Sequence, residues 1–249
     1  MLEWWQWLLA FLAALMVGIS KTGMAGLGVL SVAIFTSVLP PKESIGAVLI
    51  ALLSGDAIAV PTYFRDVQWR YLGKLMIWAA LGISLGAFAL GKINDNNIRR
   101  LIGAILVMLV LFNYGRLFLT RNTAHQGDPI VLRYPWLGWI AGLAAGFSTM
   151  IANASGPIMV LYLISLKLPK RQFIGTSAVF FMAVNLFKLP FSYHLGLINP
   201  DSLRISLWLI PFTMLGAWLG RSLLNRINQK VFEQSALVLT LIAGIRLLF

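Results

Sequence analysis

The sequence predicts an all-α membrane protein made of two inverted repeats, each a broken re-entrant helical hairpin plus three transmembrane helices. Three observations lead to this fold class: the apolar composition, a glycine-rich stretch that occurs twice, and a correspondence between the two halves of the chain. Of the 249 residues, 59% are hydrophobic and 11% are charged, whereas a soluble domain carries about 25% charged residues. Long apolar runs favour membrane helices over a barrel, whose strands would alternate in segments of about ten residues.

Ten apolar stretches follow one another along the chain, and their lengths fall into two groups. Six have about 18–21 residues, enough to cross about 30 Å of hydrocarbon at about 1.5 Å per residue; they cover 45–63, 71–91, 101–120, 173–193, 203–220 and 231–249. Four have about 12–16 residues and are too short to cross singly; they cover 4–19, 24–39, 136–147 and 155–166. The short stretches flank the two glycine-rich segments in pairs, so each pair predicts a broken hairpin.

The glycine-rich stretches 18–28 and 146–157 are the predicted helix breaks. Their small residues let the backbone leave helical geometry, and glycine accepts a positive φ at little steric cost. Within a membrane, unwound backbone is tolerated only where protein or a water-filled cavity covers it. Two such breaks at matching places in two halves indicate a transport site. We therefore expect the substrate to bind at the midplane of the membrane, between the two breaks.

The two halves of the chain correspond in sequence. The first break recurs in the second at a constant offset of 128: Gly18, Ser20 and Gly28 match Gly146, Ser148 and Gly156. After a one-residue gap the offset becomes 129, which places Asp56 opposite Asn185. The correspondence divides the chain into a first transmembrane repeat, 1–120, a polar connecting loop, 121–135, and a second transmembrane repeat, 136–249.

The relative orientation of the repeats depends on whether each broken hairpin returns to its starting side or crosses the membrane. If both return, twelve lysines and arginines of the loops share one side and six share the other. If both cross, the division is ten against eight. Because basic loops favour the cytoplasmic side, the larger bias favours re-entrant hairpins and inverted repeats, with both termini on the periplasmic side.

Of the 20 lysines and arginines, Lys21 and Lys188 are the two that remain when the others are assigned to the loops, and Asp56 is an acid deep in an apolar segment. An ionisable side chain inside a membrane segment is a candidate functional residue because burying it is unfavourable. The alternative for each lysine is that its side chain snorkels to a headgroup. We interpret both lysines as candidate substrate-binding residues. We interpret Asp56 as a coupling candidate that relays a proton, binds a cation or pairs with a lysine; a purely structural ion pair is its alternative.

The other candidate substrate-binding residues are uncharged and lie in the breaks or in the following span. Helices that resume after a break point free N–H groups and a positive dipole end into the cavity, and hydroxyl and amide groups add further donors. Together with a lysine they predict a site for a small anion, and tight helix packing through small residues is the alternative. These candidates are Ser20, Thr22, Gly26, Gly28, Ser148, Thr149, Asn153, Ser155, Gly156 and Asn185.

Several function classes find no support in the sequence. The two histidines, His125 and His194, are isolated from any cluster of metal ligands, so we expect no metal site. We also find no phosphate-binding loop, nucleophile elbow or nucleotide fingerprint, so we expect no catalytic residue, no cofactor and no enzymatic activity. The net charge of +12 is concentrated in short loops, where the positive-inside bias explains it without nucleic acid.

The glycine-rich breaks are accompanied by four shorter motifs: Pro40-Pro41-Lys42, Leu168-Pro169-Lys170, Gly175-Thr176-Ser177-Ala178, and Asn185 followed by Lys188. With these motifs the chain resembles, over essentially its whole length, the TauE/SafE sulfite exporter family, also called TSUP. The resemblance implies transport of sulfite, sulfonates, thiosulfate or related sulfur-containing anions across a bacterial inner membrane. The residues themselves support a small anion.

The leading hypothesis is therefore a secondary transporter for a small sulfur-containing anion, with membrane lipid as its other expected partner. The alternative is a channel-like anion pore, although a channel needs a continuous polar path and the polar groups gather mainly at the breaks. A membrane-embedded enzyme lacks the cluster of histidines and acids that it would need. A scaffold subunit would leave the breaks without a function.

Overall fold

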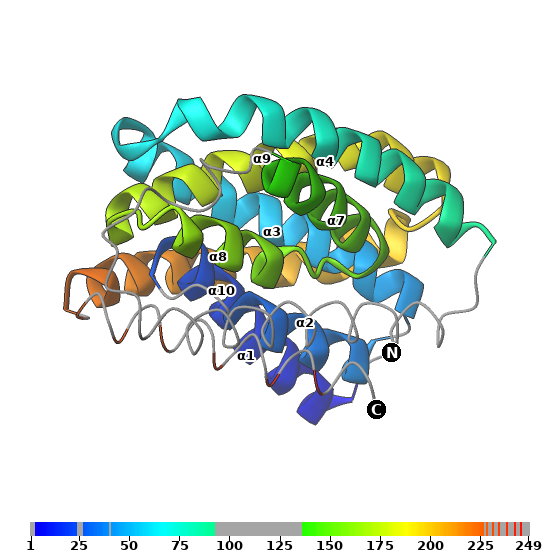
Figure 1. Cartoon of the computed structure of the whole chain (residues 1–249). Helices are drawn as coiled ribbons and strands as arrows, with labels where there is room; N and C mark the ends of the chain where they lie inside the picture. The colour runs from blue at the N-terminus through cyan, green and yellow to red at the C-terminus, as the bar shows by residue number, and fades with distance from the viewer. Residues whose placement is uncertain are drawn as a thin grey trace.

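The computed structural model describes residues 3–23, 27–39, 41–92 and 136–226, together with Asn228 and single positions beyond it. These residues form α1 (Trp4–Thr22), α2 (Leu27–Val38), α3 (Pro41–Tyr63), the short 3-10 helix η1 (Phe64–Asp66), α4 (Trp69–Leu90), α7 (Trp136–Ala152), α8 (Gly156–Ser165), α9 (Lys170–His194) and α10 (Pro200–Arg226) (Figure 1). No strand occurs in the described ranges. The predicted all-α fold class is confirmed for this part of the chain.

Within the described ranges, five helical segments are long and apolar enough to cross a membrane: Trp4–Thr22, Ser44–Asp66, Trp69–Leu90, Lys170–His194 and Pro200–Arg226. The helices α7 and α8 are apolar but shorter, as predicted. The sequence predicts that the stretch 4–19 is too short to cross singly, whereas α1 extends to Thr22 and is long enough. The prediction of a membrane protein with several apolar helices is therefore confirmed. The predicted span 101–120, the predicted loop 121–135 and most of the predicted span 231–249 lie outside the described residues.

Both helix breaks differ from the sequence prediction, because the helices run further into them. Helix α1 continues through Lys21 to Thr22, and α7 continues to Ala152. Much of each predicted break is thus helical, and the break after α7 is confined to 153–155. A glycine inside a helix costs only about 1 kcal/mol relative to alanine. Glycine-rich sequence therefore does not by itself unwind a helix that packs well against a neighbour.

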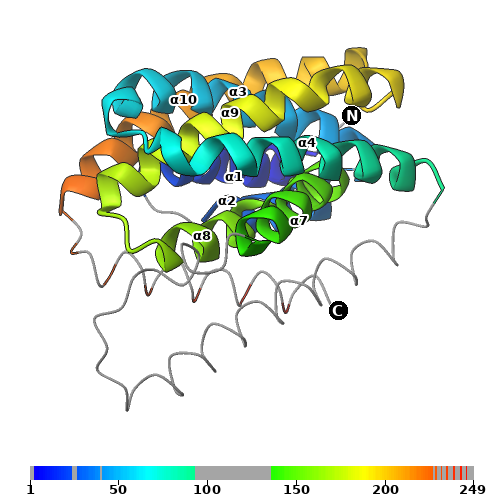
Figure 2. The same ribbon diagram turned by 45° about the horizontal axis from the view of Figure 1, so that its top comes forward.

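Two helix pairs are packed closely: α1 packs along α10, and α7 packs along α4 (Figures 1 and 2). Glycines make both contacts close. A Cβ on Gly18 would lie 2.0 Å from the Thr213 carbonyl oxygen, and a Cβ on Gly146 would lie 2.0 Å from the Ala79 carbonyl oxygen. Helices α3 and α9 contact each other, and they join the pairs because α3 also contacts α10 and α9 also contacts α4.

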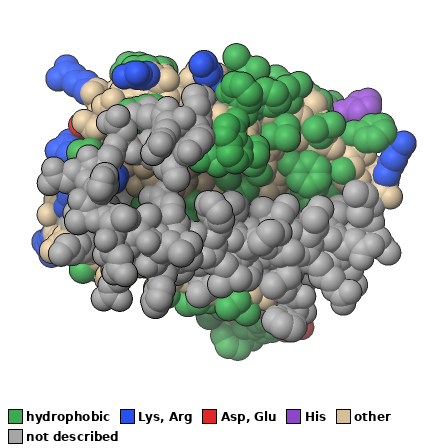
Figure 3. Space-filling view, in the orientation of Figure 1, with side chains coloured by type: hydrophobic (Ala, Val, Ile, Leu, Met, Phe, Trp, Pro, Cys, Tyr) green, Lys and Arg blue, Asp and Glu red, His purple; other side chains and the backbone are tan. Residues whose placement is uncertain are grey.

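Two clusters of buried apolar side chains hold the helices together. One cluster draws on α4, α7, α8 and α9 and includes Phe173, and the other draws on α1, α2, α3 and α10 and includes Phe35. Large apolar side chains such as Phe88 on α4 and Trp218 on α10 are instead exposed, at 66% and 67%. Figure 3 shows many exposed apolar side chains on the described part of one face. Such apolar surface is typical of a face that contacts lipid.

Replacing Gly146 by alanine is expected to lower the free energy of unfolding by about 1–3 kcal/mol, the usual cost of overpacking. The added methyl group would meet the Ala79 carbonyl oxygen at 2.0 Å, so α7 must move away from α4. The matched control is Gly73→Ala on α4, where nothing lies within 4 Å of the added carbon. Denaturant unfolding of the purified proteins in detergent measures both variants. Equal stability of the two variants would contradict the close helix contact.

Candidate functional site

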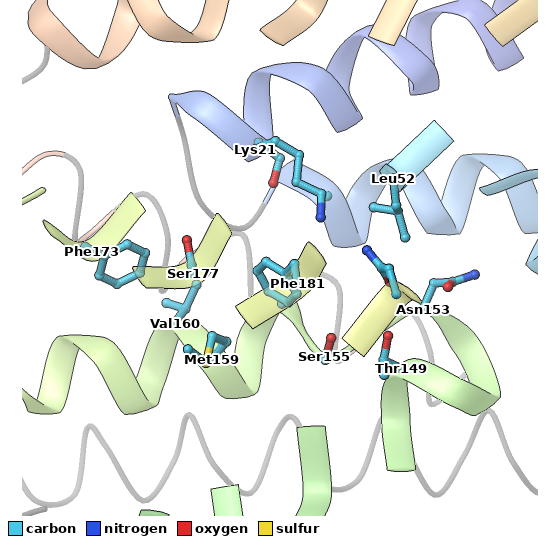
Figure 4. Close-up of a pocket in the computed structure, with 14 residues that line it drawn as sticks. Lys21, Leu52, Thr149, Asn153, Ser155, Met159, Val160, Phe173, Ser177 and Phe181 are labelled. Atoms are coloured by element: carbon cyan, nitrogen blue, oxygen red, sulfur yellow. The ribbon is translucent and has the colours of Figure 1, made fainter. Parts of the chain in front are cut away.

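The end of α1, the start of α2, the end of α7 and the start of α8 meet beside α3 and α9 and enclose a cavity (Figure 4). Its volume is about 50 Å³. Because one water molecule needs at least about 10–15 Å³, the cavity has room for a few water molecules or one small ion. Its lining residues are Ser20, Lys21, Gly28, Leu52, Thr149, Asn153, Ser155, Gly156, Met159, Val160, Phe173, Ser177, Phe181 and Asn185.

Asn153 turns the chain between α7 and α8. Its φ is 51°, a left-handed conformation that asparagine adopts more readily than most residues. The backbone N–H groups of Asn153 and Ala154 donate to the carbonyl oxygens of Thr149, at 3.0 Å, and Ser148, at 3.3 Å. These bonds satisfy carbonyl groups that the end of α7 would otherwise leave unpaired. Pro157 stands in the first turn of α8, where its missing N–H is not needed.

Lys21 reaches the cavity from the last turn of α1 (Figure 4). Its Nζ lies 2.7 Å from Asp56 Oδ1 on α3 and 4.5 Å from the centre of the Phe181 ring on α9. Lys21 is 7% exposed and Asp56 is fully buried. The carboxylate and the ring face both stabilise a buried ammonium group. Of the alternatives that the sequence leaves open for Asp56, the structure therefore shows pairing with Lys21.

Asn185 connects Asp56 with the cavity. Its Nδ2 donates to Asp56 Oδ2 at 2.8 Å, and the residue itself lines the cavity, whereas Asp56 does not. The two residues are those that the repeat places opposite each other. Asn185 Oδ1 is buried and has no hydrogen-bond partner among the described residues. Lys21 and Asn185 therefore both line the cavity and contact Asp56, which does not line it.

Lys188 lies behind the cavity wall instead of in it. Its Nζ donates to the Thr149 carbonyl oxygen at 2.9 Å, to Thr149 Oγ1 at 3.3 Å, and to Asn153 Oδ1. The side chain is fully buried. Asn153 Nδ2 in turn donates to the Ile45 carbonyl oxygen on α3 at 3.2 Å. Lys188 thus fixes two lining residues and places a positive charge at the negative end of the α7 dipole.

The structure brings most of the predicted site residues to the cavity and leaves a few elsewhere. Eight line it: Ser20, Lys21, Gly28, Thr149, Asn153, Ser155, Gly156 and Asn185. Thr22 Oγ1 instead donates to the Ala217 carbonyl oxygen on α10 at 2.6 Å, and Ser148 Oγ donates to the Ala145 carbonyl oxygen at 3.2 Å within α7. The Thr22 hydroxyl therefore joins α1 to α10, and the Ser148 hydroxyl bonds to the backbone of its own helix. Gly26 lies outside the described residues.

Six lining residues are not among the sequence candidates: Leu52, Met159, Val160, Phe173, Ser177 and Phe181. Three of them follow from Asn185 by a simple rule. Residues four apart share one face of a helix, and steps of four back from Asn185 along α9 give Phe181, Ser177 and Phe173. The same stripe of α9 thus carries both polar and aromatic groups into the cavity.

The arrangement is suited to binding a small anion. The cavity wall carries one ammonium group, from Lys21, and polar side chains such as Ser20 and Ser155. Hydrogen bonds from a charged donor to an oxyanion are about twice as strong as neutral ones. The described residues include no group of three histidines, cysteines or acids that could hold a metal ion. The chemistry that this part of the chain offers is therefore charge and hydrogen bonding.

Comparison with known families gives a match over nearly the whole chain. The family model described as sulfite exporter TauE/SafE matches residues 10–247. This is the family that the breaks and the shorter motifs predict, so that prediction is confirmed. No curated protein and no solved structure matches the chain.

Proposed function

Because the chain belongs to the sulfite exporter TauE/SafE family, we propose that it is a secondary transporter that moves a small sulfur-containing anion across the bacterial inner membrane. The substrate is a sulfite, a sulfonate or thiosulfate, and it binds in the cavity between the two helix breaks. Sulfur-anion transport by a membrane protein fits both the family and the five apolar segments long enough to span.

The observation that carries the proposal is the Lys21 ammonium group in the wall of the cavity. Sulfur oxyanions present negative charge and several acceptor oxygens, which need a cation and donors where water is scarce. Ser20, Ser155 and Ser177 bring hydroxyl groups to the same cavity. The volume of about 50 Å³ favours a small anion over a large metabolite.

Release of the anion follows from the neighbouring carboxylate. A buried lysine without a competitor would hold an anion too tightly for transport. Asp56 Oδ1 lies 2.7 Å from Lys21 Nζ, so the ammonium group exchanges between Asp56 and the anion. Lys188 acts as a positioning residue, since it holds Thr149 and Asn153 in place from behind the wall.

The helix contacts support a pseudo-two-fold relation between the two proposed repeats. Gly18 of α1 packs on Thr213 of α10, and its repeat counterpart Gly146 of α7 packs on Ala79 of α4. The same contact thus occurs twice, each time between the first helix of one repeat and a long helix of the other. An exchange of this kind is what a pseudo-two-fold axis between two repeats produces, and the charge count of the loops favours the inverted orientation. The repeats 1–120 and 136–249 meet at the cavity.

Single cysteines introduced at both ends of the chain test the proposed topology. The sequence contains no cysteine, so Glu3→Cys and Phe249→Cys each carry one thiol. We expect both thiols to react with an impermeant reagent from the periplasmic side, because inverted repeats with re-entrant hairpins place both termini there. The control is Lys74→Cys, which the charge count places on the cytoplasmic side. Labelling of the two termini from opposite faces would contradict this topology.

Uptake into liposomes that contain only this protein tests the proposed function. We expect entry of at least one of sulfite, thiosulfate and methanesulfonate, with saturation as the anion concentration rises. Saturable uptake would exclude a scaffold role, since no other subunit is present. Single-channel currents in planar bilayers would instead favour an anion pore. Absence of both uptake and current for all three anions would contradict the proposal.

A further inference from the structure

The candidate site and the wall behind it contain two lysines and one aspartate among the described residues. Two lysines among the described residues, Lys21 and Lys188, act electrostatically on Asp56. Lys188 Nζ meets three acceptors: the carbonyl and hydroxyl oxygens of Thr149 and the amide oxygen of Asn153. Three partners with acceptor oxygens match the three donors of an ammonium group, so the geometry accommodates a charged lysine. Two ammonium groups and one carboxylate leave the empty site with one positive charge in excess.

Asp56 meets polar groups from several of the helices packed around it. Lys21 comes from α1, and Asn185 and Lys188 come from α9. Helix α10 brings the neutral Thr213 close to this part of α3, and the sequence of α2 contains no titratable residue. With both lysines protonated, Asp56 is the described group at this site that can change the charge balance by taking up a proton from water.

The amide of Asn185 is arranged to serve either protonation state of Asp56. In the structure Nδ2 donates to Asp56 Oδ2 at 2.8 Å, and the buried Oδ1 has no hydrogen-bond partner among the described residues. An unpaired buried acceptor is unfavourable. A half-turn of the amide would let Oδ1 accept a hydrogen bond from a protonated Asp56. The same turn frees Nδ2 from the carboxylate, in a residue that lines the cavity.

We propose that Asp56 takes up a proton when the cavity binds a dianion and stays ionised when it binds a monoanion. This inference rests on the proposed function. A monoanion alone balances the excess charge of the empty site, whereas a dianion brings one negative charge too many, and an uncompensated buried charge is strongly unfavourable. The proton comes from water and binds Asp56 Oδ2, whose O–H then donates to Asn185 Oδ1, while Lys21 turns to the anion. A dianion therefore moves together with one proton.

Calorimetric titration of the purified protein in buffers of different ionisation enthalpy counts the protons taken up per bound anion. Thiosulfate is the dianion probe and methanesulfonate is the monoanion probe, both near neutral pH. We expect about one proton per thiosulfate bound and none per methanesulfonate bound, since one carboxylate balances one charge.

Two variants assign the proton to its site. Asp56→Asn is permanently neutral and nearly identical in shape, so thiosulfate should bind to it without proton uptake. Lys188→Met removes the excess positive charge, so methanesulfonate should now bind together with about one proton, for the same reason of charge balance. If Lys188→Met does not fold, the comparison of the two anions on the unmodified protein decides the question.

The possible outcomes separate the inference from the proposed function. The inference would be overturned if both anions bound with equal proton uptake. It would also be overturned if Asp56→Asn still took up a proton with thiosulfate. Neither result would contradict the proposed function of anion transport. Absence of binding and of uptake for every sulfur anion would contradict the proposed function, and the inference would fall with it. The expected result is that proton uptake accompanies the binding of thiosulfate and does not accompany the binding of methanesulfonate. Asp56→Asn should abolish the uptake seen with thiosulfate.

Discussion

Replacing Lys21 by alanine is expected to weaken anion binding at least tenfold, which corresponds to about 1.4 kcal/mol. Lys21 supplies the ammonium group in the cavity wall, and the residue is only 7% exposed to solvent. Its loss leaves the described cavity wall with neutral donors and helix ends. Titration of thiosulfate and methanesulfonate on the purified variant measures the change in dissociation constant.

Two further variants make the Lys21 result interpretable. Lys21→Ala leaves Asp56 buried without its ion-pair partner, which by itself destabilises a protein by about 3–5 kcal/mol. The double variant Lys21→Met with Asp56→Asn removes both charges, so it should fold and still bind at least tenfold more weakly. Lys74→Ala, on the exposed side of α4, controls for a general loss of positive charge. Unchanged affinity in the double variant would exclude Lys21 from the binding site.

Replacing Gly28 by leucine is expected to abolish transport while leaving insertion into the membrane intact. Gly28 lines the cavity, and a Cβ there would already lie 3.0 Å from Ser20 Oγ. The remaining atoms of leucine would fill space in a cavity of only about 50 Å³. Gly156→Leu places the same obstacle at the matching position of the second break. Liposome uptake measures transport, and the yield of monodisperse protein from membranes measures insertion.

Gly28→Ala is the matched control for the obstruction. Its single methyl group requires only a small shift of the Ser20 side chain, so most of the transport activity should remain. If Gly28→Leu and Gly156→Leu both transport normally, the anion does not pass between the two breaks. A gradual loss from alanine to leucine is the pattern that a narrow passage produces, because the steric conflict grows with side-chain volume.

The sequence is sufficient to identify the charged residues of the site. An ionisable side chain that lies away from the loops between the helices stands out because burying it is unfavourable, and this criterion gives Lys21, Asp56 and Lys188. Their partners require the fold, since each contact joins segments that are far apart in the chain. Asp56 and Asn185 are paired by the repeat, but the hydrogen bonds from Lys188 to Thr149 depend on how α9 crosses the end of α7.

The extent of the helix breaks is where sequence reasoning is least accurate. Glycine and serine are compatible with an unwound chain and equally with close helix packing. Gly18 and Gly146 pack against α10 and α4 within intact helices, and only the tertiary contacts distinguish the two uses. The second break is set instead by Asn153, whose left-handed φ of 51° ends α7. The spacing of residues on α9 would have located Ser177 and Phe181, because they repeat every four positions from Asn185.

The most direct measurement is an experimental structure of the protein with selenite, an analogue of sulfite whose selenium scatters X-rays anomalously. We expect a selenium peak inside the cavity, with selenite oxygens within about 3 Å of Lys21 Nζ, the usual length of such a bond. The Lys21→Met, Asp56→Asn double variant should lose this peak under the same conditions. An anomalous peak elsewhere in the protein, with the cavity between the two breaks holding water alone, would contradict the assignment of this cavity as the anion site.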